Sequence, residues 1–490
     1  MLSVRCWRRD DCCEILLRIL PINKDDKIRY FDSLARKREK WLKKGDYYHR
    51  AIANYIKFLV PAQSSILQIG CGIGNLIASL EASRKVGIDF SPKMIEVARE
   101  KYPGVEFRVD DLEALQTDEK FDYILLVNVI GYVDDIQASL TGLKKVCKAD
   151  TRIIIVYFNY LWQPILKIAE WFGLRMKRPI MHWLPPQDIR NILKLSNFET
   201  VKADYQILMP VYIPVISTLL NRIIVKMPFF RKLALNEIVI ARTCEKRRDE
   251  DDTTCSVVVP CRNEKGNIEN VVKRMPAMGK HTELIFVEGH SKDDTLAECY
   301  KVQKAYPDRD IKVMVQDGKG KADAVRKGFR EAKGDVLMIL DADLTIPPES
   351  LPKFFEAIVS GKGELIIGSR LVYQMEKEAM RTLNLLGNKF FSTMFTYLLD
   401  QRIRDTLCGT KVLRSRDYEK IVAGRSYFGE FDPFGDFDLL FGAAKLNLQI
   451  VEIPIRYRER TYGSTQIDRF RHGWLLLKMT AFAMKKIKFI

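Results

Sequence analysis

The 490-residue sequence has few of the residues that form metal clusters, and it has no cysteine motif. Its ten cysteines are scattered without a C-x-x-C pair, and its five histidines form no group at metal-ligand spacing. A zinc site built from cysteine and histidine is therefore not expected. Scattered thiols are typical of a reducing compartment, so we expect a cytoplasmic protein.

Long uninterrupted apolar runs are also lacking. Near the N-terminus, Glu14 and Arg18 interrupt a weak apolar run, so no export signal is expected. The most apolar long window, 211–230, contains Arg222 and Lys226 and does not have the composition of a spanning helix. No segment is expected to cross a bilayer. Repeats and low-complexity tracts are absent too, which excludes solenoid and disordered proteins.

A positive charge is present in excess. The formal net charge is +17 and the isoelectric point is about 9.3, in a chain that is 47% apolar and 29% charged. This excess predicts anionic partners, which are nucleic acid, acidic lipid headgroups or phosphorylated substrates. Charge alone does not choose among them, and surplus lysines on a solvated surface would give the same balance.

Short β-branched runs alternate with helical patterns in both halves of the chain, which predicts two α/β domains built from parallel β-α units. The polar stretch RTCEKRRDEDDTT separates the halves and reads as a linker. The expected parts are an N-terminal extension at 1–27, a first domain at 28–242, a linker at 243–254 and a second domain at 255–490.

The segment GDVLMILDADLTIPPE predicts a buried strand that delivers Asp341 and Asp343 at its carboxyl end. Open α/β sheets bind ligands at that edge. Two carboxylates one residue apart repel each other unless a cation lies between them and an anionic group. The spacing therefore suits Mg²⁺ or Mn²⁺ held against a diphosphate, although a bare D-x-D is a weak signal.

Further segments around this D-x-D follow the order of family 2 glycosyltransferases. These segments are SVVVPCRNEKGNIENVV, ELIFVEGHSKDDT, DGKGKADAVRKGFREAKGD, IIGSRL, DTLCGTKVL and FGDFDLLFGAAKLNLQIVEIPIRYRERTYGSTQ. Together they resemble the dolichyl- or polyprenyl-phosphate sugar (mannose) synthases of that family. The resemblance implies a GT-A-type sheet that binds a nucleoside diphosphate sugar. Glu288 and Gly289 stand where the family usually has two aspartates, which leaves the identity of the nucleotide open.

The resemblance also implies roles for individual residues. The sugar nucleotide would meet Pro260, Asn263, Glu264, Glu288, Lys321, Asp341 and Asp343, with a metal on the last two. An acceptor phosphate would meet Arg370, Arg381 and Arg460, which would position a group that is already ionised. If the acceptor is instead a hydroxyl, Asp436 is the expected general base, with Asp438 beside it.

The last segment, RFRHGWLLLKMTAFAMKKIKFI, mixes apolar and basic residues and predicts an amphipathic helix. Such a helix suits the surface of an anionic membrane, and a core-packed terminal helix would have the same pattern. We expect peripheral contact with the cytoplasmic face of a membrane.

In the first half, SSILQIGCGIGNLIASL places a glycine turn between a strand and a helix, and Asp89 ends the next strand. The glycines allow close approach of a ligand, and the carboxylate suits both hydroxyls of a ribose. With FRVDDLEAL and FDYILLVNVIGYVDD, these segments resemble class I S-adenosylmethionine-dependent methyltransferases, which have a Rossmann-like sheet. The cofactor contacts that this implies are Gly70, Cys71, Gly72, Gly74, Asp89, Asp110, Asp111 and Asn128.

The methyl acceptor is less legible, and a nicotinamide-dependent oxidoreductase remains an alternative for this half. Candidates for the acceptor pocket are Tyr47, Tyr48, His49, Asn159, Tyr160 and His182, none of them assigned as a base. The leading hypothesis is a bifunctional enzyme of surface-glycan or glycolipid assembly. The alternatives are a glycosyltransferase with a non-catalytic S-adenosylmethionine-binding domain, and a nucleic-acid methyltransferase fused to a sugar-nucleotide-binding module. Nucleic acid is not expected as a partner, because no helix-turn-helix, RNA-binding or zinc motif accompanies the charge.

Overall fold

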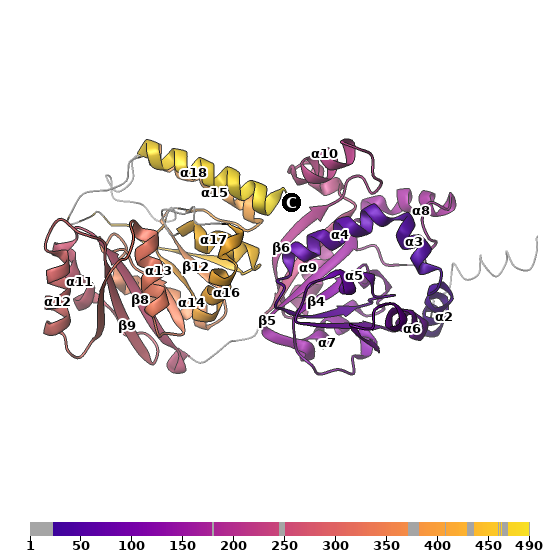
Figure 1. Ribbon diagram of the computed structural model, residues 1–490, viewed down its shortest axis with the longest axis horizontal. Helices are drawn as coiled ribbons and strands as arrows, with labels where there is room; N and C mark the ends of the chain where they lie inside the picture. The colour runs from indigo at the N-terminus through magenta and orange to yellow at the C-terminus, as the bar shows by residue number, and fades with distance from the viewer. Residues whose placement is uncertain are drawn as a thin grey trace, which may run out of the picture. The chain divides into compact units, whose positions relative to one another are not determined.

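The chain divides into two compact units, Met1–Thr243 and Cys244–Ile490, and each contains a seven-stranded sheet (Figure 1). The computed structural model describes residues 23–178, 181–244, 250–370, 382–406, 408–428, 436–458, 460, 462 and 469–489. In that part of the chain, no helix is long and apolar enough to cross a membrane.

The sheet of the first unit has the order β3-β2-β1-β4-β5-β7-β6. Its strands are β1 (Ser65–Ile69), β2 (Arg84–Asp89), β3 (Glu106–Val109), β4 (Phe121–Val127), β5 (Cys147–Phe158), β6 (Phe198–Gln206) and β7 (Asn236–Thr243). The pairs formed by β1 to β5 are parallel, whereas β7 runs antiparallel to both β5 and β6. The chain order reverses between β1 and β4, and ligands of open α/β sheets bind at such a point.

Both faces of this sheet are buried. Leu67 and Ile69 contribute to one apolar cluster and Ile66 to another, as the alternation of side chains along a strand requires. The helices are α2 (Lys24–Leu34), α3 (Arg38–Lys44), α4 (Asp46–Leu59), α5 (Asn75–Ser79), α6 (Pro92–Lys101), α7 (Ile136–Gly142), α8 (Gln163–Trp171), α9 (Pro186–Leu195) and α10 (Ile216–Arg222). The hydroxyl of Ser91 caps α6 by accepting the amide of Met94.

The second unit has the sheet order β10-β9-β8-β11-β13-β12-β14. Its strands are β8 (Thr254–Cys261), β9 (His281–Glu288), β10 (Asp310–Val315), β11 (Val336–Ile339), β12 (Leu365–Ser369), β13 (Lys411–Arg414) and β14 (Ile450–Pro454). Only β13 runs antiparallel to its two neighbours among these described strands. The parallel strands β8, β9 and β11 bring their carboxyl ends to one edge.

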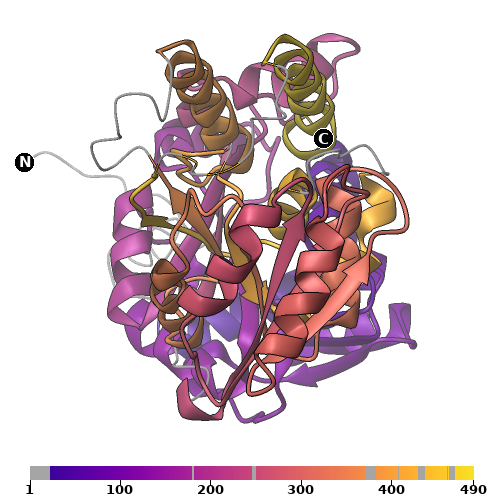
Figure 2. The ribbon, with the colours of Figure 1, turned by 90° about the vertical axis from the view of Figure 1, so that its left-hand side faces the viewer.

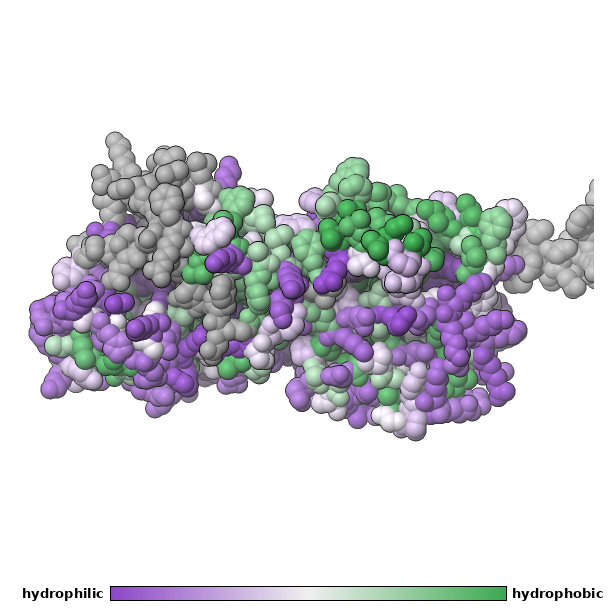
Figure 3. Space-filling view, turned by 45° about the horizontal axis from the view of Figure 1, so that its top comes forward, coloured by the Kyte–Doolittle hydropathy of each residue, from purple (hydrophilic) through white to green (hydrophobic). Residues whose placement is uncertain are grey.

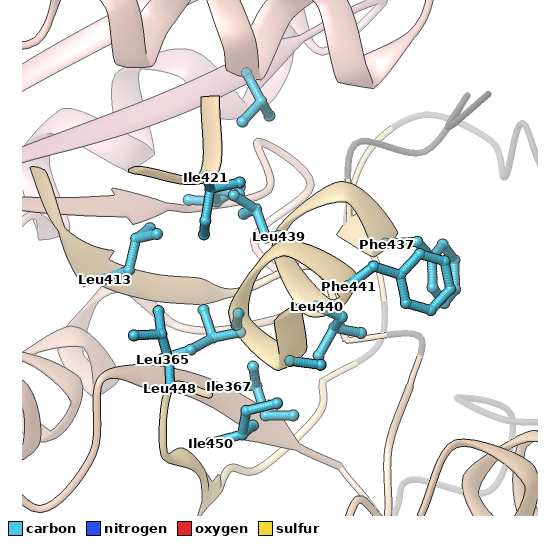
Figure 4. Packing of buried hydrophobic residues seen from close by; sticks show 14 of the residues in the cluster. Leu365, Ile367, Leu413, Ile421, Phe437, Leu439, Leu440, Phe441, Leu448 and Ile450 are labelled. Carbon is cyan, nitrogen blue, oxygen red and sulfur yellow. The ribbon is translucent and has the colours of Figure 1, made fainter. Parts of the chain in front are cut away.

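Helices cover this sheet over two large apolar clusters. They are α11 (Lys265–Arg274), α12 (Thr295–Ala305), α13 (Lys321–Glu331), α14 (Leu351–Val359), α15 (Thr382–Leu399), α16 (Ser415–Ala423), α17 (Asp436–Lys445) and α18 (Arg469–Ala483). Figure 4 shows Leu440 of α17 near Ile367 of β12, while Phe437 and Phe441 of the same helix lie together farther from the strands. The last helix, α18, contacts α15 (Figure 2) and buries Leu476 against the same cluster.

Two details differ from the sequence-based expectation of uniformly parallel β-α units. The antiparallel strand β13 inserts between β11 and β12, and β7 pairs antiparallel with both β5 and β6. In addition, β7 extends to Thr243 and β8 begins at Thr254, so the residues at both ends of the predicted linker belong to strands.

Candidate active sites

A pocket of about 360 Å³ opens at the carboxyl edge of the first sheet, where β1 and β4 lie side by side. Of the predicted cofactor contacts, the residues that line it are Gly70, Cys71, Gly72, Asp89 and Asn128. From the candidates for the acceptor pocket, Tyr48 and His49 of α4 line it as well. The size and the position are those of a small-molecule site.

The glycine turn and Asp89 form one wall of this pocket. The Asp89 carboxylate accepts hydrogen bonds from the backbone N–H of Gly72 at 2.8 Å and of Ser91 at 3.0 Å. Burial raises the pKa of Asp89, and these two amide bonds oppose the rise. Gly72 has a φ of +55°, and a Cβ placed there would meet nothing within 4 Å. The backbone at Gly72 therefore faces open space that a ligand can approach closely.

Two polar side chains of the pocket are incompletely satisfied. The amide oxygens of Gln68 and Asn128 are buried and accept no hydrogen bond from any described residue. The Asn128 amide nitrogen, in contrast, donates to the Tyr48 hydroxyl at 3.2 Å. Buried acceptors without donors are rare in folded proteins. Their presence in the wall of this pocket fits a site that binds a polar ligand.

Cationic residues that the sequence analysis did not identify face the same pocket. Arg38 of α3 and Arg178 line it, and neither forms an ion pair with a carboxylate among the described residues. Burial and the nearby Arg178 guanidinium lower the pKa of Arg38 to about 10. Burial and both guanidiniums lower the pKa of His49 to about 3, so its imidazole is neutral at physiological pH. The sequence signal for Arg38 was weak, because the basic helix around it resembles a solvated surface.

The other predicted cofactor contacts do not line this pocket. A Cβ at Gly74 would lie 2.5 Å from the Phe107 ring, so packing explains this glycine. The Asp110 carboxylate accepts the backbone N–H of Asp111 and of Gln116. Asp111 caps a short 3₁₀ helix and pairs with Lys24. These two carboxylates stabilise the turn after β3.

In the second unit, the parallel strands bring the predicted nucleotide and metal residues to one edge of the sheet. Asn263 and Glu264 follow β8, Glu288 ends β9, and Asp341 and Asp343 follow β11. Within the described residues, no group of three or more His, Cys, Asp or Glu side chains is arranged to hold a metal ion. The metal site that the sequence predicts there has two carboxylates, Asp341 and Asp343, and would need further oxygens from a ligand such as a diphosphate.

Asp341 is held by a cation from α13. Its carboxylate lies 2.6 Å from the Lys321 ammonium. Burial would raise the pKa of Asp341, but Lys321, Lys411 and Arg370 outweigh this effect and hold the pKa below its usual value. The backbone of Gly409 crosses directly over the pair, because a Cβ there would lie 2.0 Å from the Asp341 carboxylate. The glycine in DTLCGTKVL is thereby explained by close packing.

Arg460 links Asp343 to Glu264. Its guanidinium donates to Asp343 at 2.6 Å and to Glu264 at 3.1 Å. The other Asp343 oxygen accepts the backbone N–H and the hydroxyl of Thr345. Burial raises the pKa of Glu264, and Arg460 opposes the rise. The structure thus joins a residue predicted for the acceptor, Arg460, to residues predicted for the donor.

The turns after β8 and β9 hold each other in place. The side-chain oxygen of Asn263 accepts a hydrogen bond from the backbone N–H of Lys292. The backbone N–H of Asn263 donates to the Ser291 hydroxyl at 2.9 Å. Glu288 is buried and accepts the backbone N–H of His290 and Ser291. Pro260 lies in β8 opposite Val287, one strand position before the turn. These residues form a compact edge where a base and a ribose are expected.

The remaining acceptor candidates are placed differently. The Arg370 guanidinium donates two hydrogen bonds, of 2.7 and 2.8 Å, to the two carboxylate oxygens of the buried Asp405. Asp405 outweighs the effect of burial and raises the pKa of Arg370, so its guanidinium fork is engaged within the fold. Asp438 is buried and pairs with Arg326 and Arg425. Arg381 and the side chain of Asp436 lie outside the described residues.

Comparison with known families follows the same division of the chain. The family model described as "Methyltransferase domain" matches residues 4–203, and that described as "Glycosyl transferase family 2" matches residues 256–422. The chain joins a methyltransferase domain to a family 2 glycosyltransferase domain. This result confirms both resemblances and the two-domain α/β fold that the sequence predicted.

Curated relatives match the glycosyltransferase domain. The dolichol-phosphate mannosyltransferase of Pyrococcus furiosus is 29% identical over 245 residues, which span 48% of this chain and 66% of that protein. The polyprenol monophosphomannose synthase of Mycolicibacterium smegmatis is 28% identical, over 43% of this chain and 80% of that protein. For the methyltransferase domain, a crystal structure of a SAM-dependent methyltransferase from Thermotoga maritima aligns with 17% identity and a TM-score of 0.35. It covers 43% of this chain and 97% of that one.

Proposed function

We propose that the chain is a bifunctional enzyme of glycan or glycolipid assembly. Its second domain transfers a sugar from a nucleoside diphosphate sugar to a polyprenyl phosphate or a glycan acceptor. Its first domain transfers a methyl group from S-adenosylmethionine to a sugar, a lipid or a related intermediate. The observation that carries the proposal is the edge of the second sheet, where Asp341 and Asp343 stand between Lys321 and Arg460.

The charges at this edge suit a metal and a diphosphate. Mg²⁺ or Mn²⁺ would bind Asp341 and Asp343 and would supply Lewis-acid stabilisation of the departing nucleoside diphosphate. Lys321, 2.6 Å from Asp341, would then turn to the diphosphate oxygens, and Arg460, 2.6 Å from Asp343, would become available to the acceptor. Pro260, Asn263, Glu264 and Glu288 would bind the base and the ribose.

The acceptor side favours a phosphate over a hydroxyl. Arg460 is accessible from the carboxylate edge, since a quarter of its side chain is exposed, whereas Arg370 is engaged by Asp405. A phosphate is already ionised at neutral pH and needs positioning by cations instead of deprotonation. We assign Arg460 as the principal described phosphate ligand, with Arg381 and Arg370 as candidates. Asp436 would act as a general base only toward a hydroxyl acceptor. The names of the curated relatives point to mannose as the first sugar to test.

The pocket of the first domain fits S-adenosylmethionine. Asp89 would bind the ribose hydroxyls, the glycine turn from Gly70 to Gly72 would follow the cofactor, and Asn128 would meet it with the amide oxygen that lacks a donor. Arg38 and Arg178 offer two guanidiniums to an anionic group, either the carboxylate of the cofactor or a charged group of the methyl acceptor. The neutral His49 lies beside them, and its low pKa makes it a poor proton acceptor, so we assign it no role as a base.

The proposal is tested with the full chain and a set of donors and acceptors. GDP-mannose and other GDP- and UDP-sugars are incubated with a short-chain polyprenyl phosphate, and separately with soluble hydroxyl acceptors, with Mn²⁺, Mg²⁺ or a chelator. We expect metal-dependent formation of a polyprenyl-phosphate sugar. Transfer that persists in the chelator would remove the metal assignment, and transfer to soluble hydroxyls alone would replace the phosphate acceptor with the Asp436 route. Binding of S-adenosylmethionine, measured by calorimetry on the same preparation, tests the first domain.

A further inference from the structure

An exposed apolar face covers one side of the methyltransferase domain (Figure 3). Two segments form it, residues 160–174 with α8 and residues 211–233 with α10, and they contain most of the exposed large apolar side chains of the described residues. Trp171 is 80% exposed, Phe229 76% and Val215 78%. Soluble monomers rarely expose so large a contiguous apolar surface without a binding partner.

The two segments are fixed to the domain and to each other. The Trp162 indole N–H donates to the Leu233 carbonyl at 2.8 Å, and the Asn159 side chain donates to the Lys232 and Ala234 carbonyls. Below the face, the Lys226 ammonium lies 2.9 Å from the buried Asp204. On the inner side of the two segments, Leu166 of α8 and Ser217 of α10 are buried. The outward position of the large apolar side chains is therefore part of the folded structure.

The charged residues within the two segments of the apolar face are almost all basic. Between residues 207 and 234 there is no Asp or Glu, while Arg222, Arg231 and Lys232 lie in the same segment. In the other segment the single acidic residue, Glu170, is paired with Arg175. Exposed tryptophan and phenylalanine surrounded by lysine and arginine suit the interface of a bilayer that contains anionic lipid. A protein partner of ordinary composition would not require this absence of acidic residues.

The face adjoins the helices that line the methyltransferase pocket. The Asn221 side chain, at the end of α10, donates to the Tyr47 hydroxyl of α4 at 3.0 Å, and the next two residues, Tyr48 and His49, line the pocket. The Lys44 ammonium of α3 donates to the Gly173 carbonyl after α8. Helices α3 and α4 therefore lie between the apolar face and the pocket.

We propose that this apolar face is a membrane-docking surface, by which the methyltransferase domain rests on an anionic lipid bilayer with its pocket close to the lipid interface. The surface is distinct from α18 at the C-terminus. The inference does not rest on sugar transfer, and it restricts the methyl acceptor to molecules that reach the membrane surface.

Flotation of the full chain with phosphatidylcholine vesicles, with and without phosphatidylglycerol, tests the proposal. The variant Trp171→Ser/Phe229→Ser removes two exposed aromatic side chains from the face. We expect binding to the anionic vesicles to weaken by about tenfold or more, since each lost side chain removes buried apolar area. The control Tyr300→Ser/Val422→Ser, which removes two exposed apolar side chains of the other domain, should bind as the unaltered protein does.

Affinity for S-adenosylmethionine and the melting temperature show whether the variant is folded. A third variant, Trp474→Ser in α18, tests the C-terminal helix separately. Three results would overturn the proposal: no vesicle binding by the unaltered protein, equal binding by the double variant, or loss of binding only in Trp474→Ser. A change of molar mass in light scattering on replacing Trp171 and Phe229, without loss of vesicle binding, would show instead that the face joins two copies of the chain.

Discussion

The two candidate sites differ in how their polar groups are satisfied before any ligand binds. In the methyltransferase pocket, the amide oxygens of Gln68 and Asn128 lack donors, and Arg38 and Arg178 lack carboxylate partners among the described residues. In the glycosyltransferase site, the opposite holds for the carboxylates, because Lys321 and Arg460 already neutralise Asp341 and Asp343.

This difference indicates two ways in which a binding site remains stable without its ligand. Amide oxygens without donors cost a modest amount each and can be left for the cofactor. Two partly buried carboxylates close to each other would repel, and the fold supplies a cation to each of them. Under the proposed function, a metal and a diphosphate would displace these cations together, which would couple binding of the metal to binding of the sugar nucleotide. The predictions below test this contrast.

The largest effect is expected from Asp343→Ala. It removes one of the two proposed metal ligands and breaks the ion pair with Arg460, which also donates to Glu264. Sugar-nucleotide turnover should fall on the order of a thousandfold, or about 4 kcal/mol, because the developing charge of the leaving group is no longer neutralised. Single-turnover assays measure the loss. Asp310→Ala, which removes an exposed carboxylate at the opposite end of the strands, serves as the control.

Affinity for S-adenosylmethionine should remain unchanged in Asp343→Ala, since the two sites belong to separate units. A variant that keeps its turnover in the presence of a chelator would contradict the metal site. A variant that loses both functions together would indicate unfolding, which circular dichroism detects.

A smaller effect, on stability, is expected from Arg370→Met. This change leaves the fully buried Asp405 without its cation, at a cost of about 3 kcal/mol. Arg370 outweighs burial and holds the pKa of Asp405 below its usual value. The stability from this pair is therefore present at neutral pH and is lost as pH falls through the lowered pKa. Urea unfolding at several pH values should show the two proteins converging in acid; a constant difference would contradict this role.

A still smaller effect is expected from Asp89→Ala in the methyltransferase pocket. Affinity for S-adenosylmethionine should fall more than tenfold, by about 2 kcal/mol, through the loss of charge-assisted bonds to the ribose. Asp118→Ala, an exposed carboxylate of the same unit, is the matched control for titration calorimetry. Unchanged affinity in Asp89→Ala would contradict its contact with the ribose of the cofactor.

The sequence predicted most of the fold because its parallel strands are short continuous apolar runs. The apolar run in SSILQIGCGIGNLIASL forms β1, and the run in GDVLMILDADLTIPPE forms β11. The strands that it missed lack that signature. In β6, FETVKADYQ is mixed in polarity, and β3 has only four residues. The antiparallel direction of β7 and β13 depends on long-range pairing, which local patterns do not encode.

The candidate sites were predictable to the extent that strand ends determine them. Asp89 is the last residue of β2, and Asp341 and Asp343 come shortly after β11. Their positions can be predicted because ligands of open α/β sheets bind at the carboxyl ends of the strands. Partners that come from distant segments were not predictable. Nothing local indicates that Arg370 pairs with Asp405, or that Arg38 enters the methyltransferase pocket.

The last prediction concerns Lys321→Met, which makes the glycosyltransferase site resemble the other pocket by removing an internal counter-ion. Burial then raises the pKa of Asp341 with less opposition, since Lys411 and Arg370 act on it without Lys321. Metal binding requires the ionised carboxylate, so Mn²⁺ affinity should begin to fall at a higher pH than in the unaltered protein. Where Asp341 is ionised in both proteins, the variant should bind Mn²⁺ more tightly, because the Lys321 ammonium no longer competes for this carboxylate. Titrations of Mn²⁺ by electron paramagnetic resonance should therefore give pH curves that cross.

Lys327→Met, which removes a lysine of α13 that pairs with the exposed Asp317, should leave the curve unchanged. Parallel curves for Lys321→Met would show that Lys321 and the metal do not compete for Asp341.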